Sequence, residues 1–240
     1  MSSQRPPRPP VSTESTPVDS LTDPRAITLL TTEHWSLLSA RSLAYNEAFV
    51  RGGMFLTFMS MSFVGLALLS QAIGFAEGFL PITAIVLAFD LVIGLTTFGR
   101  ICGANSDDLR ALHGMARIRH GYTEIAPIVT RYLTTARYDD VDSVLADYGS
   151  TFMPTIVYAL TTSAGMIGLI TAMVGGVLAV VIGLLLGLAP AAALWIGLGA
   201  GVLLFLGLAV LTFRLIAREQ AGVEALFPSP EALPGSDEDS

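Results

Sequence analysis

Two long stretches of this sequence, residues 54–99 and 155–213, contain almost no charged side chain. The first holds only Glu77 and Asp90, and the second holds none. Soluble domains carry about a quarter charged residues, whereas the hydrocarbon of a bilayer strongly disfavours them. About 20 apolar residues in a helix cross the ~30 Å of hydrocarbon. The two stretches therefore predict an all-α integral membrane protein.

The lengths of these stretches predict four transmembrane helices, arranged as two antiparallel hairpins. The first stretch divides at a short link after Ile73, and the second divides at Gly-Leu-Ala-Pro, residues 187–190. The predicted spans are 54–73, 80–99, about 166–186 and about 191–213. Residues 152–165 are apolar but include Pro154, so they are either an interfacial segment or an extension of the third span.

The remaining sequence is expected to lie outside the hydrocarbon. Proline-rich residues 1–24 and acidic residues 214–240 predict disordered tails, because they offer little apolar surface to bury. Residues 25–53 predict an amphipathic helix, and residues 100–154 predict a small helical segment between the second and third spans. The apolar stripe of the amphipathic helix is formed by Trp35, Leu38, Tyr45 and Phe49, which follow helical spacing.

The distribution of arginine predicts the orientation of the spans. All 13 basic residues are arginine. Five precede the first span, six lie in 100–154 and two follow the last span, while the two hairpin links contain none. Basic residues accumulate on the cytoplasmic side. Both termini and the central segment are therefore expected in the cytoplasm, and the arginine-rich composition suggests a bacterial inner membrane.

The composition also excludes several function classes. Without lysine the chain has no Walker A phosphate loop, and one cysteine, Cys102, excludes a multi-cysteine zinc site. A net charge of −7 argues against a nucleic-acid partner. No catalytic motif is found, so a non-enzymatic protein without metal or cofactor is expected. A juxtamembrane lipid enzyme that uses His113 or His120 is the remaining enzymatic alternative.

Asp90 is the most informative single residue, because it lies at the middle of the second predicted span. A charged group there costs about 3 kcal/mol on insertion scales, so the side chain is expected to face other helices or water. Thr83, Gly94 and Thr97 share its helical face. In a hairpin, Ser62 and Gly65 lie level with it. Asp90 is either a proton- or cation-sensitive group on a pathway, or a protonated or hydrogen-bonded residue that fixes helix packing.

The second pair of spans carries small residues at four-residue spacing. Such rows let helix backbones approach closely within a membrane. The row residues are Gly168, Ala172, Gly176, Gly183, Gly187, Ala193, Gly197 and Gly201. Gly176 is expected level with Gly201, so the rows either face each other inside the hairpin or form a contact between copies. A homo-oligomer is therefore expected.

A row of polar residues follows the second span on one helical face. Its members are Arg110, His113, Arg117, His120 and Glu124. This face is either a site for anionic lipid, nucleotide or metal and a pH sensor, or a solvated surface opposite an apolar face. The turn acids Asp139, Asp140 and Asp142 are candidate cation ligands, although exposed turn acids ordinarily bind only water.

Together these patterns predict a four-span, self-associating membrane protein. One hypothesis is a small pore or an ion- or proton-responsive protein with Asp90 near its pathway. The alternative is a membrane scaffold or sensor, in which Asp90 is structural and the cytoplasmic helices bind a protein partner.

Overall fold

The computed structural model of this chain describes residues 21, 23–74, 78–146 and 162–232. These residues form helices and turns and no strand. The long helices are α1 (Pro24–Ile73), α2 (Phe79–Ile125), α5 (Ser163–Leu185) and α6 (Pro190–Ala221). The short ones are η1 (Pro127–Tyr132), α3 (Val141–Ala146) and η3 (Pro230–Ala232).

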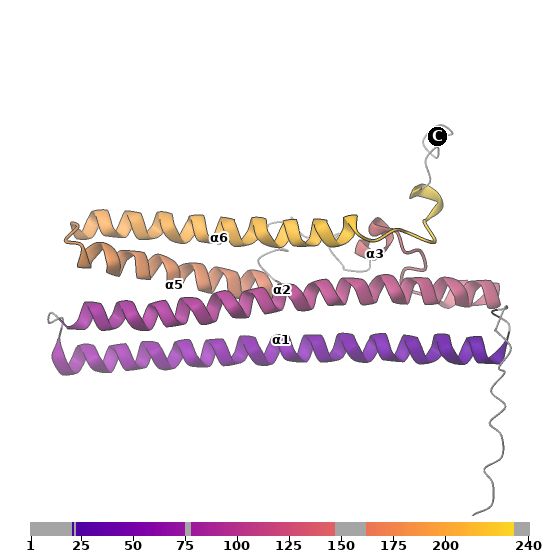
Figure 1. Cartoon of the computed structure of the whole chain (residues 1–240), viewed down its shortest axis with the longest axis horizontal. Helices are drawn as coiled ribbons and strands as arrows, with labels where there is room; N and C mark the ends of the chain where they lie inside the picture. The colour runs from indigo at the N-terminus through magenta and orange to yellow at the C-terminus, as the bar shows by residue number, and fades with distance from the viewer. Residues whose placement is uncertain (1–20, 22, 75–77, 147–161, 233–240) are drawn as a thin grey trace, which may run out of the picture.

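All four long helices are long and apolar enough to cross a membrane. They pack side by side in the order α1, α2, α5, α6, with most contacts between neighbours in that order (Figure 1). The end of α1 and the start of α2 lie at the same end of the molecule as the α5–α6 turn (Figure 1). The opposite halves of α1 and α2 extend beyond α5, and this half of α2 contacts α3 (Figure 1).

Local sequence signals explain where these helices begin. Asp23 caps α1, because its carboxylate accepts the Arg25 N–H at 2.8 Å and Pro24 occupies the first turn. Thr162 caps α5 by accepting the Gly165 N–H at 3.1 Å. Pro190 begins α6 after a turn in which Gly187 adopts φ +81°, a conformation that glycine tolerates without strain.

The helix α1 contains both the predicted helix at 25–53 and the first predicted span. It continues without a break to Ile73, so its 50 residues reach about 75 Å at 1.5 Å per residue. The predicted apolar stripe is also not the buried face. Trp35 is 63% exposed and Phe49 is 70% exposed, whereas Leu37 and Ala48 lie on the side that packs against the rest of the fold.

The helix α2 also passes its predicted end. Residues 105–108 are polar and predict a helix start, but α2 runs through them from Phe79 to Ile125. The predicted helical segment at 100–154 is therefore continuous with the second span in its described part. It contains the second half of α2, then η1 and α3. Residues 147–161 lie outside the described part, so the two alternatives for 152–165 are not distinguished.

The third and fourth predicted spans correspond to α5 and α6. The helix α6 is longer than its predicted span and includes residues 214–221, which were predicted to be disordered. The residues after α6 also contact the rest of the fold. The backbone of 224–229 forms hydrogen bonds with the second half of α2 and with the loop before α3.

The apolar core lies where α1, α2 and α5 meet. Phe55 of α1, Phe98 and Ile101 of α2, and Ile167 of α5 are all almost completely buried in one cluster. A second cluster joins Leu87 of α2 to α5. Because α2 and α5 are the central helices, polar residues on their facing sides are removed from both lipid and water.

Candidate functional site

Asp90 lies at this central contact and is 0% exposed. The hydroxyl of Ser62 on α1 donates a hydrogen bond to Asp90 Oδ1 at 3.0 Å. Asp90 Oδ2 is buried without a hydrogen-bond partner among the described residues. Gly65, the other residue predicted to lie level with Asp90, has open space beside it. The carboxyl group therefore connects α2 to α1 through one oxygen.

The residues predicted to share a face with Asp90 are all buried. Thr83 is 7% exposed and Thr97 is 8% exposed, and Gly94 lies between them on the packed side of α2. The Thr83 hydroxyl donates to the Phe79 carbonyl at 2.8 Å. Thr83 is thus satisfied within its own helix and is not a hydrogen-bond partner of Asp90.

Gly94 provides the close approach of α2 to its neighbours. A Cβ atom there would lie 2.6 Å from Thr171 Oγ1 of α5 and 3.1 Å from Phe55 Cζ of α1. Thr171 is completely buried and donates to the Ile167 carbonyl at 2.7 Å. Sequence reasoning missed Thr171, although it is the sole polar side chain of α5 after Ser163.

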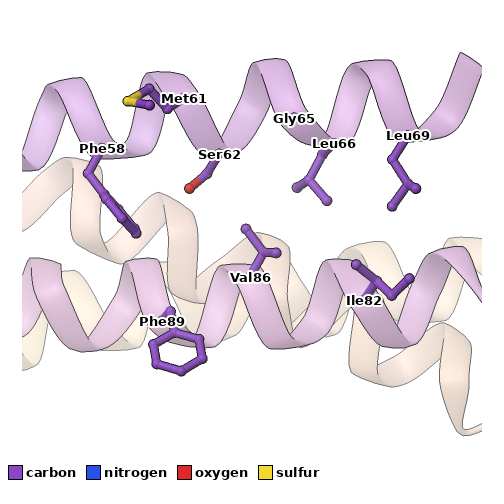
Figure 2. Close-up of a pocket in the computed structure, with 9 residues that line it drawn as sticks. All are labelled: Phe58, Met61, Ser62, Gly65, Leu66, Leu69, Ile82, Val86 and Phe89. Carbon is purple, nitrogen blue, oxygen red and sulfur yellow. The ribbon is translucent and has the colours of Figure 1, made fainter.

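A groove runs between α1 and α2 beside this contact (Figure 2). Figure 2 shows the Ser62 hydroxyl pointing from α1 toward α2, with Phe58 on one side of it and Leu66 on the other. The lining residues are Phe58, Met61, Ser62, Gly65, Leu66, Leu69, Ile82, Val86 and Phe89. Asp90 is not among them, and Ser62 supplies the one polar side chain. The lining is suited to apolar groups rather than to an ion.

The small-residue rows bring α5 and α6 together at mid-depth. A Cβ atom on Gly176 would lie 2.9 Å from the Gly197 carbonyl oxygen and 3.3 Å from Gly201 Cα. A Cβ atom on Gly201 would lie 3.2 Å from the Ala172 carbonyl oxygen. Backbone atoms cannot move aside as a side chain can, so glycine is required for this approach.

The rest of these rows divides between three environments. Gly183 approaches the fully buried Ala193 across the α5–α6 contact. Gly168 instead faces Phe98 of α2, with 3.0 Å from its virtual Cβ to Cε2. Gly187 lies in the turn and approaches nothing. The rows therefore serve packing within one chain at most of their positions.

The polar row on the second half of α2 is solvated at Arg110 and Glu124, but several of its members also contact other parts of the chain. Arg110 donates two hydrogen bonds to Glu219 of α6, at 2.8 and 2.6 Å. Arg117 Nε donates to Asp139 at 2.6 Å, and its Nη2 donates to the Glu224 carbonyl at 2.7 Å. Both arginines therefore connect α2 to the C-terminal part of the chain.

The two histidines of this row are also covered. His113 is 3% exposed, and its Nδ1 lies 3.0 Å from the Asp139 carbonyl oxygen. The His120 ring stacks on Phe227 with 4.2 Å between centroids and 19° between planes. Its Nε2 lies 3.6 Å from Glu124. The row is therefore buried at His113 and exposed at Arg110 and Glu124.

The turn acids Asp139 and Asp140 are buried and accept backbone N–H groups. Burial acts to raise the pKa of Asp139, but hydrogen bonds from the Leu226 N–H, Arg117 and the Phe227 N–H outweigh it and lower that pKa. Burial likewise opposes the hydrogen bonds from Ser143 and Ser229, and the pKa of Asp140 is lowered. Across the described ranges no group of three or more His, Cys, Asp or Glu residues is arranged to hold a metal ion.

Charged contacts also join α1 to α2 outside the apolar region. Asp108 is 2% exposed and accepts from Arg41 at 2.5 Å and from the Tyr45 hydroxyl at 3.0 Å. Glu47 accepts from Arg100 and from Arg51, and these hydrogen bonds lower its pKa to about 2. The sequence indicated only the local Glu47–Arg51 pair, because the other partners are 53 or more residues apart.

No protein-family model, curated protein or solved structure matches this chain.

Proposed function

We propose that this protein is a membrane scaffold or sensor in which Asp90 is structural and the cytoplasmic helices bind a protein partner. One observation carries the proposal. Asp90 is completely buried at the contact of α1, α2 and α5, where Ser62 is hydrogen-bonded to it and the neighbouring groove does not include it. A group that acts on ions or protons needs access to them, and this position supports packing instead.

In this proposal α1 with α2 and α5 with α6 form two transmembrane hairpins in a bacterial inner membrane. The proposed orientation keeps both termini in the cytoplasm, and the arginine asymmetry supports it. The second half of α2 then extends into the cytoplasm beside the first half of α1. This extension is about 25 residues long, with a rise of 1.5 Å per residue. The ion pairs of Asp108 and Glu47 hold the two extensions together. This paired extension, with the docked C-terminal residues, is the proposed partner-binding region.

The protein is proposed to be non-enzymatic and to self-associate in the bilayer. The support for self-association comes from the apolar parts of α1 and α6. They are largely exposed in one chain, so a second copy could cover them. The small-residue rows mostly face inward, so they do not supply the contact between copies.

A small pore or an ion- or proton-responsive protein is the second candidate. The observation that favours it is Asp90 Oδ2, which is buried without a hydrogen-bond partner among the described residues. An unpaired carboxyl oxygen at mid-span is costly in hydrocarbon. A bound proton, cation or water at this oxygen would offset that cost.

Ion flux in liposomes separates the two candidates. Wild-type protein and the Asp90→Asn variant are reconstituted at equal density, and proton and sodium flux are measured under a pH or sodium gradient. The scaffold proposal expects flux at the level of empty liposomes for both. Wild-type flux that disappears in Asp90→Asn would overturn it and favour the pore. Ser62→Ala is the matched control, because it removes the hydrogen bond but keeps the ionisable group.

A further inference from the structure

The residues after α6 lie against the second half of α2 and the loop before α3, with a bend at Leu226 and Phe227. We refer to residues 223–229 as the C-terminal segment, and to Arg117, His120, Asp139 and Asp140 as its docking site. The C-terminal segment begins directly after Gly222, the residue that ends α6. Its sequence, Val-Glu-Ala-Leu-Phe-Pro-Ser, contains one aromatic residue.

The docking site contacts the C-terminal segment mainly through the segment's backbone. Asp139 Oδ1 accepts the Phe227 N–H at 2.7 Å, and Oδ2 accepts the Leu226 N–H at 2.9 Å. The Asp139 N–H in turn donates to the Phe227 carbonyl at 3.2 Å. One carboxylate thus accepts two successive main-chain N–H groups at the bend, and these hydrogen bonds do not depend on the side chains of the segment.

Two further backbone contacts fix the ends of the segment. Arg117 Nη2 donates to the Glu224 carbonyl at 2.7 Å, and Asp140 Oδ1 accepts the Ser229 N–H at 2.9 Å. The contacts thus cover residues 224–229, and each of these hydrogen bonds uses a main-chain atom of the segment. Hydrogen bonds to charged side chains are stronger than neutral ones, so these contacts are well suited to hold a peptide.

The docking site also contacts one side chain of the C-terminal segment. The Phe227 ring stacks on His120 at 4.2 Å, whereas the neighbouring Leu226 is 59% exposed. Aromatic stacking adds to the energy of area burial and requires a defined geometry. A competing ligand therefore needs a backbone that can adopt the bend at 226–227 and one aromatic residue, and little else.

The docking site is also held together by contacts that do not involve the segment. Arg117 Nε is hydrogen-bonded to Asp139 at 2.6 Å, and His113 Nδ1 lies 3.0 Å from the Asp139 carbonyl. Asp140 accepts the Ser143 N–H and hydroxyl at the start of α3. None of these contacts uses an atom of the segment, which favours a site that is preorganised for a replacement.

We propose that Arg117, His120, Asp139 and Asp140 form a peptide-binding site for a bent segment that carries one aromatic residue. The C-terminal segment is its resident ligand, and a segment of the protein partner with the same chemistry replaces it. This inference rests on the proposed function, since it gives the partner its binding place. The resident segment competes at the millimolar effective concentration typical of a short linker, so free peptide binds wild-type protein weakly.

A labelled peptide tests this site in the full-length protein. A fluorescein-labelled peptide with the sequence of residues 222–231 is titrated against protein in nanodiscs, and anisotropy is recorded. Phe227→Ala in the protein removes the ring of the resident segment, while the peptide keeps its own. We expect saturable binding to this variant, at least about tenfold tighter than to wild type. Leu226→Ala is the matched control, because its side chain is exposed, and it is expected to behave as wild type.

Two further variants show whether the peptide occupies the docking site. Adding Asp139→Asn or His120→Ala to Phe227→Ala is expected to weaken peptide binding at least about tenfold, as is alanine in place of phenylalanine in the peptide. Circular dichroism and size-exclusion profiles identify a variant that has lost its fold, and His120→Ala keeps the test valid if Asp139→Asn unfolds.

Two outcomes would overturn the peptide site. One is the absence of saturable binding to Phe227→Ala, and the other is equal binding when both docking-site variants are added. Neither outcome bears on ion flux in liposomes. The peptide site and the proposed scaffold function can therefore fail separately.

Discussion

The hydroxyl of Ser62 donates a hydrogen bond to Asp90 Oδ1 across the α1–α2 contact, at 3.0 Å. Each residue gives the polar group of the other a hydrogen-bond partner, so neither group is left unpaired in the apolar contact between the two helices. A hydrogen bond between helices in a membrane contributes about 0.6–2 kcal/mol, so this contact orients α1 on α2 more than it stabilises the whole fold.

Substitutions at Asp90 should show whether the polarity or the charge of its side chain contributes to the free energy of unfolding. Asp90→Asn keeps an oxygen acceptor for Ser62, so we expect a near-wild-type unfolding midpoint in detergent. Asp90→Leu leaves the Ser62 hydroxyl without this acceptor and should lower the free energy of unfolding by about 1–2 kcal/mol. Thr83 should be unaffected, because its partner is the Phe79 carbonyl. A Leu variant as stable as wild type would mean that the carboxyl group has no packing role.

Gly94 should be the least replaceable glycine of α2. In Gly94→Ala the new Cβ lies 2.6 Å from Thr171 Oγ1 and 3.1 Å from Phe55 Cζ, so the helices must separate. We expect a loss of about 1–3 kcal/mol, measured by denaturation in detergent. Gly99→Ala is the control, because its Cβ meets nothing within 4 Å. Adding Thr171→Ala should restore part of the loss, and the absence of any restoration would argue against this contact.

The buried ion pair of Asp108 should matter far more than the exposed pair beside it. Asp108→Asn removes the charge that Arg41 faces, and Arg41 is only 23% exposed, so a cost of about 2–3 kcal/mol is expected. Asp107 and Arg110 are each 59% exposed, so Asp107→Asn should change stability by less than about 0.5 kcal/mol. Equal effects in thermal unfolding would show that Asp108 is not an important link between α1 and α2.

The four apolar helices could be predicted because hydrophobic length is a local property of the chain. The continuity of α2 through residues 105–108 could not. Residues 105–108 have the composition of a helix start, but the Asp108 carboxylate binds Arg41 and Tyr45 instead of capping a backbone. These partners are 67 and 63 residues away, so no local pattern reveals them.

The candidate sites divide in the same way. Helical geometry was enough to place Ser62 beside Asp90 and to place Gly176 level with Gly201. The docking of residues 224–229 depends on backbone atoms, whose hydrogen bonds have no side-chain signature. An apolar pair, Leu226 and Phe227, within a polar tail was the one available signal. Disorder was predicted there because composition describes side chains and carries no information on backbone hydrogen bonds.

Cysteine labelling should test the proposed orientation. In a Cys102→Ser background, a cysteine at Leu188, in the turn between α5 and α6, should react with an impermeant thiol reagent in intact cells. A cysteine at Asp142 should react only after the cells are opened. The arginine asymmetry is the reason, since basic residues are retained on the cytoplasmic side. The reverse pattern would place α3 and the C-terminal segment outside the cytoplasm.

Acid should release the C-terminal segment. Despite burial, which acts to raise them, hydrogen bonds lower the pKa values of Asp139 and Asp140 below the ordinary value of 3.8. A carboxyl group with a lowered pKa stabilises the docked state fully above its ordinary value. That contribution is lost as pH falls through the lower value in the docked state. The segment should therefore stay docked at neutral and mildly acidic pH and be released only below about pH 4.

Anisotropy of a fluorophore on a cysteine at Ala232, in the Cys102→Ser background, measures this release. We expect one decrease below about pH 4, while a label at Leu188 reports no change in that range. Asp139→Asn should already give low anisotropy at neutral pH, because Arg117 and the backbone N–H groups lose their charged acceptor. The other titratable groups that face the segment are His113, through the Asp139 carbonyl, and His120, through Phe227. A midpoint at about pH 6–7 would therefore contradict control by the two carboxylates and assign release to a histidine.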